Sequence, residues 1–443
     1  MTSFDLVVRG GVIVNHAGRG VGDVGVRDGK IAAIGDLGTA SAGEVIDATG
    51  LHVLPGVIDT QVHFREPGKE YKEDLETGSR AAALGGVVGV FEMPNTDPST
   101  TTLAALNDKL ARARGRMHVD HAFYAGAAAD NVDDLVEMER APGCCGIKIF
   151  MGASTGSLLV QRDEDVTRVL SAARRRVAVH SEDEFRMSER RGLARDGDWT
   201  SHHEVRDVES AVRSTTRLLA IAQRLRRRIH VLHVSTAEEL PLLAAARDIA
   251  TVEVLPNHLT LAAPEAYGRL KGRAQQNPPI REARHRAALW EALRSGLVDV
   301  VGSDHAPHTA DEKAKPYPQS PSGTPGVQTL VPVMLTHVAE GRLTLERFVD
   351  LTSTSPQRVF QLAGKGRLSL GYDADLTLVD LAARREITDA QQASRVGWTP
   401  FAGMIAKGWP VATIVRGRMV MRDGELVSVG VGVPIRFLET LSA

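Results

Sequence analysis

Two different patterns of hydrophobic and polar residues divide the chain. Near the N-terminus, short apolar segments are separated by turn signals such as Arg27-Asp28-Gly29. The C-terminal region has the same pattern, with Arg422-Asp423-Gly424 as a turn. This pattern predicts short strands at residues 4–8, 11–14, 24–27, 30–34 and 44–46, and at residues 375–379, 411–416, 418–421 and 425–427. Because β-rich ends flank a different middle, we expect a small β-sandwich domain built from residues 1–53 and 365–443 together.

The middle region, residues 54–364, alternates between apolar runs and segments with helical periodicity. Helix-period segments such as 102–114 and 211–226 lie between runs that are apolar throughout, as parallel strands buried on both faces require. The eight strand candidates are residues 57–64, 87–93, 118–124, 146–150, 177–180, 229–234, 251–255 and 298–302. Eight strands with helical connections predict an α/β fold of the (β/α)₈ barrel type, and an open doubly wound sheet is the alternative.

Composition and charge narrow the classes of function. The 443 residues are 43% hydrophobic and 24% charged, which excludes a disordered or fibrous chain. A formal charge of -2 gives no electrostatic case for a nucleic-acid or anionic-membrane partner. No run approaches the roughly 18 apolar residues that span a bilayer. The only two cysteines, the neighbours Cys144 and Cys145, cannot build a disulfide framework. Residues 1–5 lack the basic head and apolar stretch of a secretory signal. We therefore expect a cytoplasmic protein with a small-molecule substrate.

Polar residues gather at the ends of the predicted barrel strands, where barrel enzymes place their active sites. The candidates are His63, Asn95, Lys148, His180, His233 and Asp304. Each alone is more often structural, but Lys148 is unusual because burying an ammonium group in an apolar strand is costly. A nearby carboxylate would relieve that cost, and so would carbamylation by CO₂, which creates a group able to bridge two metal ions. Three histidines, an aspartate and such a lysine form a ligand set that suits Zn²⁺.

Three stretches carry a resemblance to a known family. They are His63-Phe64-Arg65-Glu66-Pro67-Gly68 followed by Lys72-Glu73-Asp74, then Met93-Pro94-Asn95-Thr96, and then Ser303-Asp304-His305-Ala306-Pro307-His308. In these stretches the sequence resembles the amidohydrolase superfamily, its cyclic amidohydrolases, and most closely the dihydroorotases. The resemblance covers nearly the whole chain and implies a metal-dependent barrel enzyme.

The resemblance also implies roles for individual residues. Arg65 and Asn95 would hold the substrate carboxylate, with His308 as a further carboxylate contact and Asn277 as a contact of the ring. A forked guanidinium independently suits a small ring that bears a carboxylate. The structural alternative for Arg65 is an ion pair with Glu66 or Glu70.

By the same resemblance, carbamylated Lys148 would bridge two Zn²⁺ ions. His180 and His233 would bind the second ion, and His63 and Asp304 the first. Asp304 would take a proton from a metal-activated water and pass it to the departing ring nitrogen. The implied reaction is the reversible hydrolysis of dihydroorotate to N-carbamoyl-L-aspartate, a step of pyrimidine biosynthesis.

Two residues depart from the family pattern. Gln61 stands where the first histidine of a His-X-His pair is usual, and its amide oxygen is a weaker zinc ligand than imidazole. We therefore predict a strong second metal site and a weak or empty first site, with one or two zinc ions per chain. Asn257 replaces the first histidine of a Pro-His-His stretch, which could alter substrate contacts. The stretch around Lys148 resembles the lysine-bridged forms and the hydantoinases.

Several alternatives stay open. The substrate could be that of another cyclic amidohydrolase, of the hydantoinase, dihydropyrimidinase or allantoinase type. The chain could also be a degenerate, non-catalytic partner of aspartate carbamoyltransferase, which Gln61 and Asn257 favour and the retained Lys148 and histidines oppose. A homo-oligomer formed through the sandwich is compatible with the sequence, although no residue requires it. The Pro- and Gly-rich segment 316–326 is either a lid over the barrel mouth or a rigid surface loop.

Overall fold

A parallel sheet rolled into a nearly closed barrel forms the larger part of the molecule. The computed structural model describes residues 3–154 and 158–441. Within this part of the chain the barrel sheet has eight strands in the order β13-β12-β11-β10-β9-β8-β7-β6. Their bounds are β6 Val57–Val62, β7 Val87–Glu92, β8 Asp120–Gly126, β9 Cys144–Phe150, β10 Val177–His180, β11 Ile229–Val231, β12 Ala250–Val254 and β13 Val300–Val301.

The first and last strands meet just beyond their ends, which distinguishes a barrel from an open sheet. A bridge joins Val62 to His305, and the backbone N–H of His63 donates to the carbonyl of His305 at 2.7 Å. Every residue of β6, β7, β8 and β9 is buried, as runs that are apolar on both faces predicted. The predicted barrel is confirmed, and the open doubly wound alternative is wrong.

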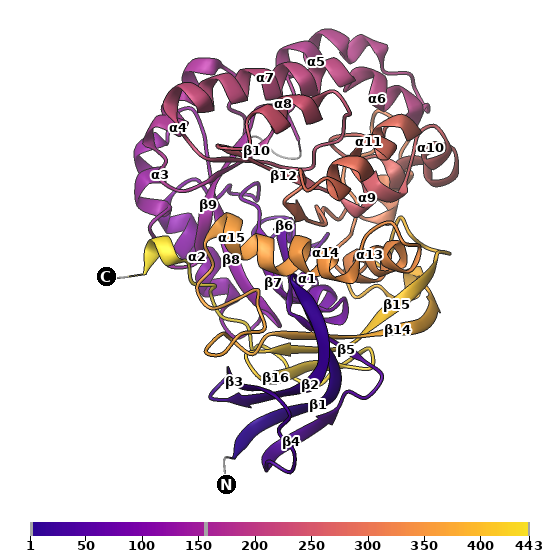
Figure 1. Cartoon of the computed structure of the whole chain (residues 1–443). Helices are drawn as coiled ribbons and strands as arrows, with labels where there is room; N and C mark the ends of the chain where they lie inside the picture. The colour runs from indigo at the N-terminus through magenta and orange to yellow at the C-terminus, as the bar shows by residue number, and fades with distance from the viewer. Residues whose placement is uncertain (1–2, 155–157, 442–443) are drawn as a thin grey trace.

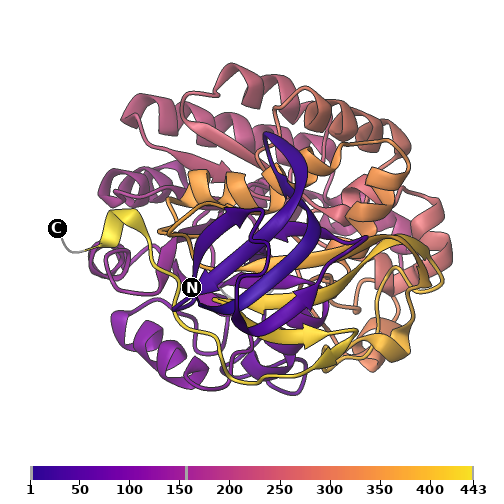
Figure 2. The same cartoon turned by 60° about the horizontal axis from the view of Figure 1, so that its bottom comes forward.

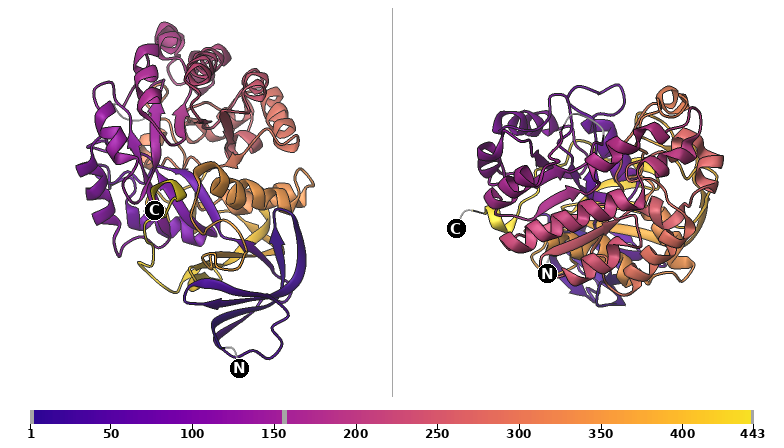
Figure 3. Two further views of the ribbon diagram at one scale, coloured as in Figure 1. Left: turned by 60° about the vertical axis from the view of Figure 1, so that its left-hand side comes forward. Right: turned by 90° about the horizontal axis from the view of Figure 1, so that it is seen from above.

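Helices enclose the barrel, as the view from above shows (Figure 3). In the described residues they are α1 Leu75–Leu84, α2 Leu103–Ala113, α3 Val132–Met138, α4 Asp163–Ala172, α5 Glu184–Arg190, α6 His202–Val205, α7 Val208–Leu225, α8 Glu239–Ala245, α9 Pro256–Thr260, α10 Glu265–Leu270, α11 Ala283–Arg294, α12 Ala310–Ala314, α13 Leu330–Ala339, α14 Leu345–Val349 and α15 Ser355–Phe360. Side-chain caps define where several begin: Asp74 and Thr77 form a capping box at α1, and Asp207 accepts from the backbone of Ser210 at α7. None of these helices is both long and apolar enough to cross a membrane.

The two ends of the chain combine in a second sheet, which lies below the barrel in Figure 1. In the described residues it has nine strands: β1 Phe4–Asn15, β2 Gly18–Arg27, β3 Lys30–Gly35, β4 Ala42–Asp47, β5 His52–Pro55, β14 Leu376–Glu386, β15 Ile405–Val415, β16 Arg418–Arg422 and β17 Glu425–Leu426. β5 pairs with both β1 and β14 and so joins the ends, whose strands lie side by side in Figure 2. The structure thereby confirms that the two ends of the chain form one small β domain together. Its predicted boundaries at residues 53 and 365 stay a prediction.

One detail of this sheet differs from the prediction. Residues 4–8 and 11–14, expected as two strands, form the single strand β1, because a register shift between Val8 and Gly11 absorbs the apparent break.

The second sheet packs against the N-terminal ends of the barrel strands. Only Gly56 separates β5 from β6, and Thr377 of β14 donates to the carbonyl of Gly86, just before β7. The buried ammonium of Lys365 lies 2.6 Å from carboxylate oxygens of both Asp120, at the start of β8, and Asp375. The C-terminal ends of the barrel strands therefore face away from most of this sheet.

Candidate active site

Two histidines meet at the C-terminal ends of β10 and β11. Nδ1 of His180 lies 3.0 Å from Nε2 of His233, and the rings are nearly perpendicular. Burial lowers the pKa of both imidazoles, so both are neutral, which is the form that binds metal ions. Two neutral ring nitrogens that converge in this way are typical of ligands to one ion.

Glu182 holds His180 from the other side. Its Oε2 lies 2.9 Å from Nε2 of His180, and the same carboxylate forms an ion pair with Arg206. Burial alone would raise the pKa of Glu182, but Arg206 and His180 outweigh it and lower this pKa to about 2. An ionised carboxylate on Nε2 fixes the tautomer of His180 that leaves Nδ1 available as a ligand.

Lys148 lies on β9, beside β10. Its backbone pairs with Ala178, two residues before His180, so Lys148 and His180 share one face of the sheet. The ammonium group lies 4.4 Å from the centre of the Phe150 ring, and Nζ has no hydrogen-bond partner among the described residues. Burial lowers the pKa of Lys148 to about 7, although Asp304 and Glu253 act in the opposite direction. With this pKa a substantial fraction of the amine is neutral near pH 7, and the neutral amine is the form that can react with CO₂.

A second pair, His63 and Asp304, forms where β6 and β13 end. Nε2 of His63 lies 3.2 Å from Oδ1 of Asp304, and Nδ1 of His63 lies 2.8 Å from Oδ1 of Asn95. The side-chain amide of Gln61 donates to the same Asp304 oxygen at 2.9 Å. Gln61 therefore competes with a metal ion for one of the two carboxylate oxygens of Asp304.

The metal ligands predicted from the sequence thus form two pairs. No three His, Cys, Asp or Glu side chains of residues 3–154 and 158–441 group closely enough to hold an ion by themselves. His180 and His233 need a third donor, and the buried Nζ of Lys148, unpaired in the described chain, is the nearest chemical match once it carries a carbamate. These residues are therefore candidates to hold one metal ion on the His180 side, and the pair beside Gln61 is the poorer candidate.

Arg65 lies two residues after His63 and is buried without an anionic hydrogen-bond partner in the described structure. Its Nε donates to the carbonyl of Pro307 at 3.2 Å, and a terminal nitrogen lies 3.3 Å from Nε2 of His308. Arg65 forms no ion pair with Glu66 or Glu70 in the described structure: Glu66 binds Arg116 at 2.7 Å, and Glu70 accepts from the backbone N–H of Gly68 at 3.0 Å. Burial lowers the pKa of Arg65 to about 10, so the guanidinium remains a cation. Its fork can therefore accept an anionic ligand.

The neighbouring His308 is fixed by several contacts. The ammonium of Lys72 lies 3.0 Å from Nδ1 of His308, and the indole of Trp398 donates to the His308 carbonyl at 2.8 Å. Trp398 belongs to the segment between β14 and β15, so this part of the second sheet reaches the site. By contrast, Asn277 lies 3.1 Å from Nε2 of His202, and no hydrogen bond joins it to the other candidates in the described residues.

Backbone conformation also singles out the site. Arg65, His233 and Asp304 adopt positive φ angles of 64°, 39° and 47°, a region that non-glycine residues rarely enter. Such conformations cluster at functional sites, where the surrounding structure holds them in place.

Two carboxylates were not recognised as site residues from the sequence. They are Glu182, two residues after His180, and Glu253 of β12. Glu253 accepts from Thr60 at 3.0 Å, and burial raises its pKa to about 8. A glutamate inside the apolar run 251–255 is the same signal as a lysine inside residues 146–150, so the argument applied to Lys148 could have found it.

Two further expectations concern the loops around the site. The segment 316–326 is anchored: Lys313 donates to the carbonyl of Pro321 at 2.7 Å, and the Gln275 amide donates to that of Ser320 at 2.8 Å. These bonds favour the rigid loop over a lid. Asn257 donates to Gln276 at 2.6 Å and to Thr324 at 2.8 Å, so it ties α9 to this loop.

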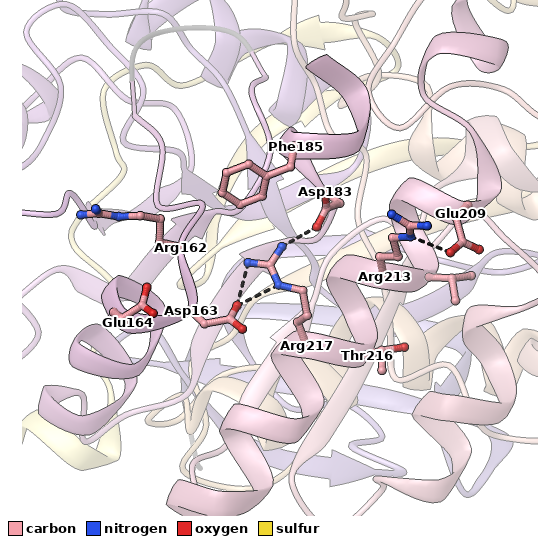
Figure 4. A pocket seen from close by; sticks show the side chains of 10 residues that line it. Arg162, Asp163, Glu164, Asp183, Phe185, Glu209, Arg213, Thr216 and Arg217 are labelled. Atoms are coloured by element: carbon pink, nitrogen blue, oxygen red, sulfur yellow. Dashed lines mark hydrogen bonds and ion pairs between the residues drawn. The ribbon is translucent and has the colours of Figure 1, made fainter. Parts of the chain in front are cut away.

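A cavity of about 780 Å³ lies elsewhere, between α4, α5 and α7 (Figure 4). Arg217 reaches both Asp163 and Asp183 there, and Arg213 binds Glu209 at 2.7 Å. Because these charges neutralise one another, the cavity is a weaker candidate than the strand ends for an active site.

Comparison with known proteins gives similarities along nearly the whole chain. The profile of the amidohydrolase family matches residues 52–420. A dihydroorotase of Methanosarcina acetivorans is 36% identical over 416 residues, which cover 90% of this chain and 88% of that protein. An allantoinase of Rubrobacter xylanophilus is 36% identical over 442 residues, with 97% and 96% covered. The solved structure of an L-hydantoinase (dihydropyrimidinase) from Arthrobacter aurescens has a TM-score of 0.93 at 32% identity, with 98% and 99% covered.

Proposed function

Since this chain belongs to the amidohydrolase family and is a hydrolase of cyclic amides, we propose that its substrate is dihydroorotate and its metal is zinc. The reaction is the reversible interconversion of dihydroorotate and N-carbamoyl-L-aspartate. The proposal depends on one observation above the others, the buried cation of Arg65 beside the metal-ligand candidates.

Arg65 supports a substrate with a carboxylate. Its guanidinium is buried and its described hydrogen-bond partners, Pro307 and His308, are uncharged. Dihydroorotate carries a ring carboxylate that a forked donor can bind through two parallel hydrogen bonds. Carboxylates such as Asp304 and Glu92 act on Arg65 only at longer range, so dihydrouracil, hydantoin and allantoin, which lack the ring carboxylate, would leave its fork without an anionic hydrogen-bond partner.

The zinc ion would be held by His180, His233 and carbamylated Lys148. When bound there, zinc supplies a Lewis acid that polarises the ring carbonyl and makes water more acidic. The hydrogen bond from Gln61 to Asp304 supports one tightly held ion per chain rather than two.

Asp304 is the residue that moves the proton. Gln61 fixes its Oδ1, which leaves Oδ2 to accept a proton from the attacking water. Hydroxide adds to the ring carbonyl carbon, the carbon–nitrogen bond breaks, and Asp304 returns the proton to the departing nitrogen. The net reaction consumes one water molecule and opens one ring. The same steps in reverse close N-carbamoyl-L-aspartate into the ring and release that water.

The rival substrates are uncharged cyclic amides. The similarity to the Arthrobacter aurescens L-hydantoinase and to the Rubrobacter xylanophilus allantoinase supports them. With these substrates Arg65 would serve only to hold the loop at Pro307.

Turnover of a panel of rings separates these proposals. Zinc-loaded protein is assayed on dihydroorotate, dihydrouracil, allantoin and 5-carboxymethyl hydantoin, beside Arg65→Gln and the matched control Arg80→Gln, whose arginine binds Glu76 on α1. Removing one partner of a buried charged contact costs about 2–5 kcal/mol, so kcat/KM of Arg65→Gln on dihydroorotate should fall about thirtyfold or more. The Arg80 variant should match the wild type.

The contrary results are equally specific. A preference for dihydrouracil or allantoin would overturn the dihydroorotate proposal. Absence of turnover on all four rings, together with co-purification of aspartate carbamoyltransferase, would instead support a non-catalytic partner.

A further inference from the structure

A second cavity, of about 570 Å³, lies on the side of the barrel. It is bounded by α9, α10, α11 and α13 and by the turn before β15, which are neighbours at the right of Figure 1. Its volume is within the usual range for small-molecule sites. None of the proposed zinc ligands lines it, and no part of the proposed function requires it.

Three arginines from three separate segments line this cavity. Arg342, after α13, lies 3.3 Å from a carboxylate oxygen of Glu340. Arg286 of α11 donates to the carbonyl of Thr260 at 3.0 Å. The side chain of Arg269, on α10, makes no hydrogen bond or ion pair within residues 3–154 and 158–441. Since Glu340 is also shared with Lys407, the cavity carries a net positive charge.

A buried histidine adds an unused donor. His337 is 3% exposed and lines the cavity, and its Nε2 lies 2.8 Å from the hydroxyl of Thr260. Its Nδ1 is buried and makes no hydrogen bond in the described chain, although a carboxylate oxygen of Glu340 lies 3.8 Å away, beyond hydrogen-bond distance. When the Thr260 hydroxyl donates to Nε2, the ring proton resides on Nδ1, where it can donate to a ligand. A buried polar atom without a partner is costly unless a ligand satisfies it.

The charge and shape of this cavity select a class of ligand. One carboxylate is satisfied by one guanidinium fork, whereas a phosphate group has enough oxygens for several. The apolar part of the wall, with Leu261, Phe401 and Met404, suits an uncharged group attached to that phosphate. We propose that this cavity is a binding site for a phosphorylated small molecule.

The cavity is mechanically linked to the substrate side of the barrel. Arg286 and His337 both contact Thr260, the last residue of α9. α9 has five residues, and its Asn257 binds Gln276 and also Thr324, which belongs to the segment 316–326. A ligand that draws Arg286 away from the Thr260 carbonyl therefore loosens a helix that contacts both sites.

Binding is tested without reference to turnover. Isothermal titration is carried out on the full chain with inorganic phosphate, AMP and adenosine. The variants are Arg269→Gln combined with Arg342→Gln, and the control Arg294→Gln, an exposed arginine of α11 bound to Glu291. We expect saturable binding of phosphate or AMP, at least a tenfold loss of affinity in the double variant, and less than a twofold change in the control.

The arms of this experiment distinguish the sources of the phosphate group. Tighter binding of AMP than of phosphate indicates a phosphorylated metabolite, and equal binding indicates the inorganic ion. Adenosine that binds as well as AMP, or a folded double variant with wild-type affinity, overturns the proposal. Hydrogen exchange of residues 256–260 should increase when the probe is bound, and unchanged exchange would refute the link through α9.

Discussion

Replacing Glu182 with glutamine removes the charge behind His180 while keeping the shape of the side chain. Glu182 is fully buried, and its carboxylate contacts Nε2 of His180 at 2.9 Å and the guanidinium of Arg206. A glutamine oriented with its oxygen toward His180 can still accept a hydrogen bond. It cannot balance Arg206, and it makes the imidazole less basic toward a metal ion.

The expected effects on metal binding and on stability can be separated. Mutating the hydrogen-bond partner of a metal-binding histidine typically lowers metal affinity by about 10- to 100-fold, so we expect Glu182→Gln to bind zinc more weakly by that factor. Removing one member of a buried ion pair costs about 3–5 kcal/mol of folding free energy. Arg206→Gln breaks the same ion pair but leaves the carboxylate on His180, so it is the matched control.

Zinc affinity is measured by competition with a chromophoric chelator, and stability by denaturant unfolding of the metal-free chain. We expect both variants to lose stability, and only Glu182→Gln to lose zinc affinity by tenfold or more. If Arg206→Gln weakens zinc as strongly, or if Glu182→Gln binds zinc within twofold of the wild type, then Glu182 does not position His180.

Other substitutions test further parts of the account. Lys148→Met should abolish turnover and zinc binding, yet stabilise the metal-free protein by about 1–3 kcal/mol in denaturant unfolding, because it removes a buried amine that has no partner in the described chain. Gln61→His should raise the metal content from one to two zinc ions per chain by elemental analysis, since it frees Oδ1 of Asp304 and adds an imidazole. Lys365→Met should lower the free energy of unfolding by about 3–5 kcal/mol, because it leaves the buried Asp120 and Asp375 without their shared cation. Treatment with a chelator should remove activity, and added zinc should restore it, as assayed by ring opening.

The barrel was predictable because its signal is local and repeated. The run 177–180 matches β10 without error, and the other seven runs each contain most of a barrel strand. Strands buried on both faces must be apolar along their whole length, so each can be recognised in the sequence as a continuous apolar run. The pairing of β5 with β1 and β14 was expected only as a shared domain, because a register between residues far apart in sequence leaves no local pattern.

The candidate site was predictable as a set of residues but not as contacts. His180 and His233 were expected together, and they lie 3.0 Å apart. The hydrogen bond from Gln61 to Asp304 could not be foreseen, because it depends on the side-chain rotamers of two residues on β6 and beyond β13. Trp398 reaches His308 from a segment whose sequence carries no catalytic motif, so its contribution required the tertiary structure.

The most direct test of the central claim is a crystal structure of zinc-loaded protein with anomalous diffraction measured at the zinc absorption edge. The account predicts one strong peak bound by Nδ1 of His180, Nε2 of His233 and a carbamate on Lys148, and a weak peak or none beside Gln61. A zinc-loaded crystal without a peak at His180 and His233, or with an unmodified Lys148 turned away from the ion, would contradict it.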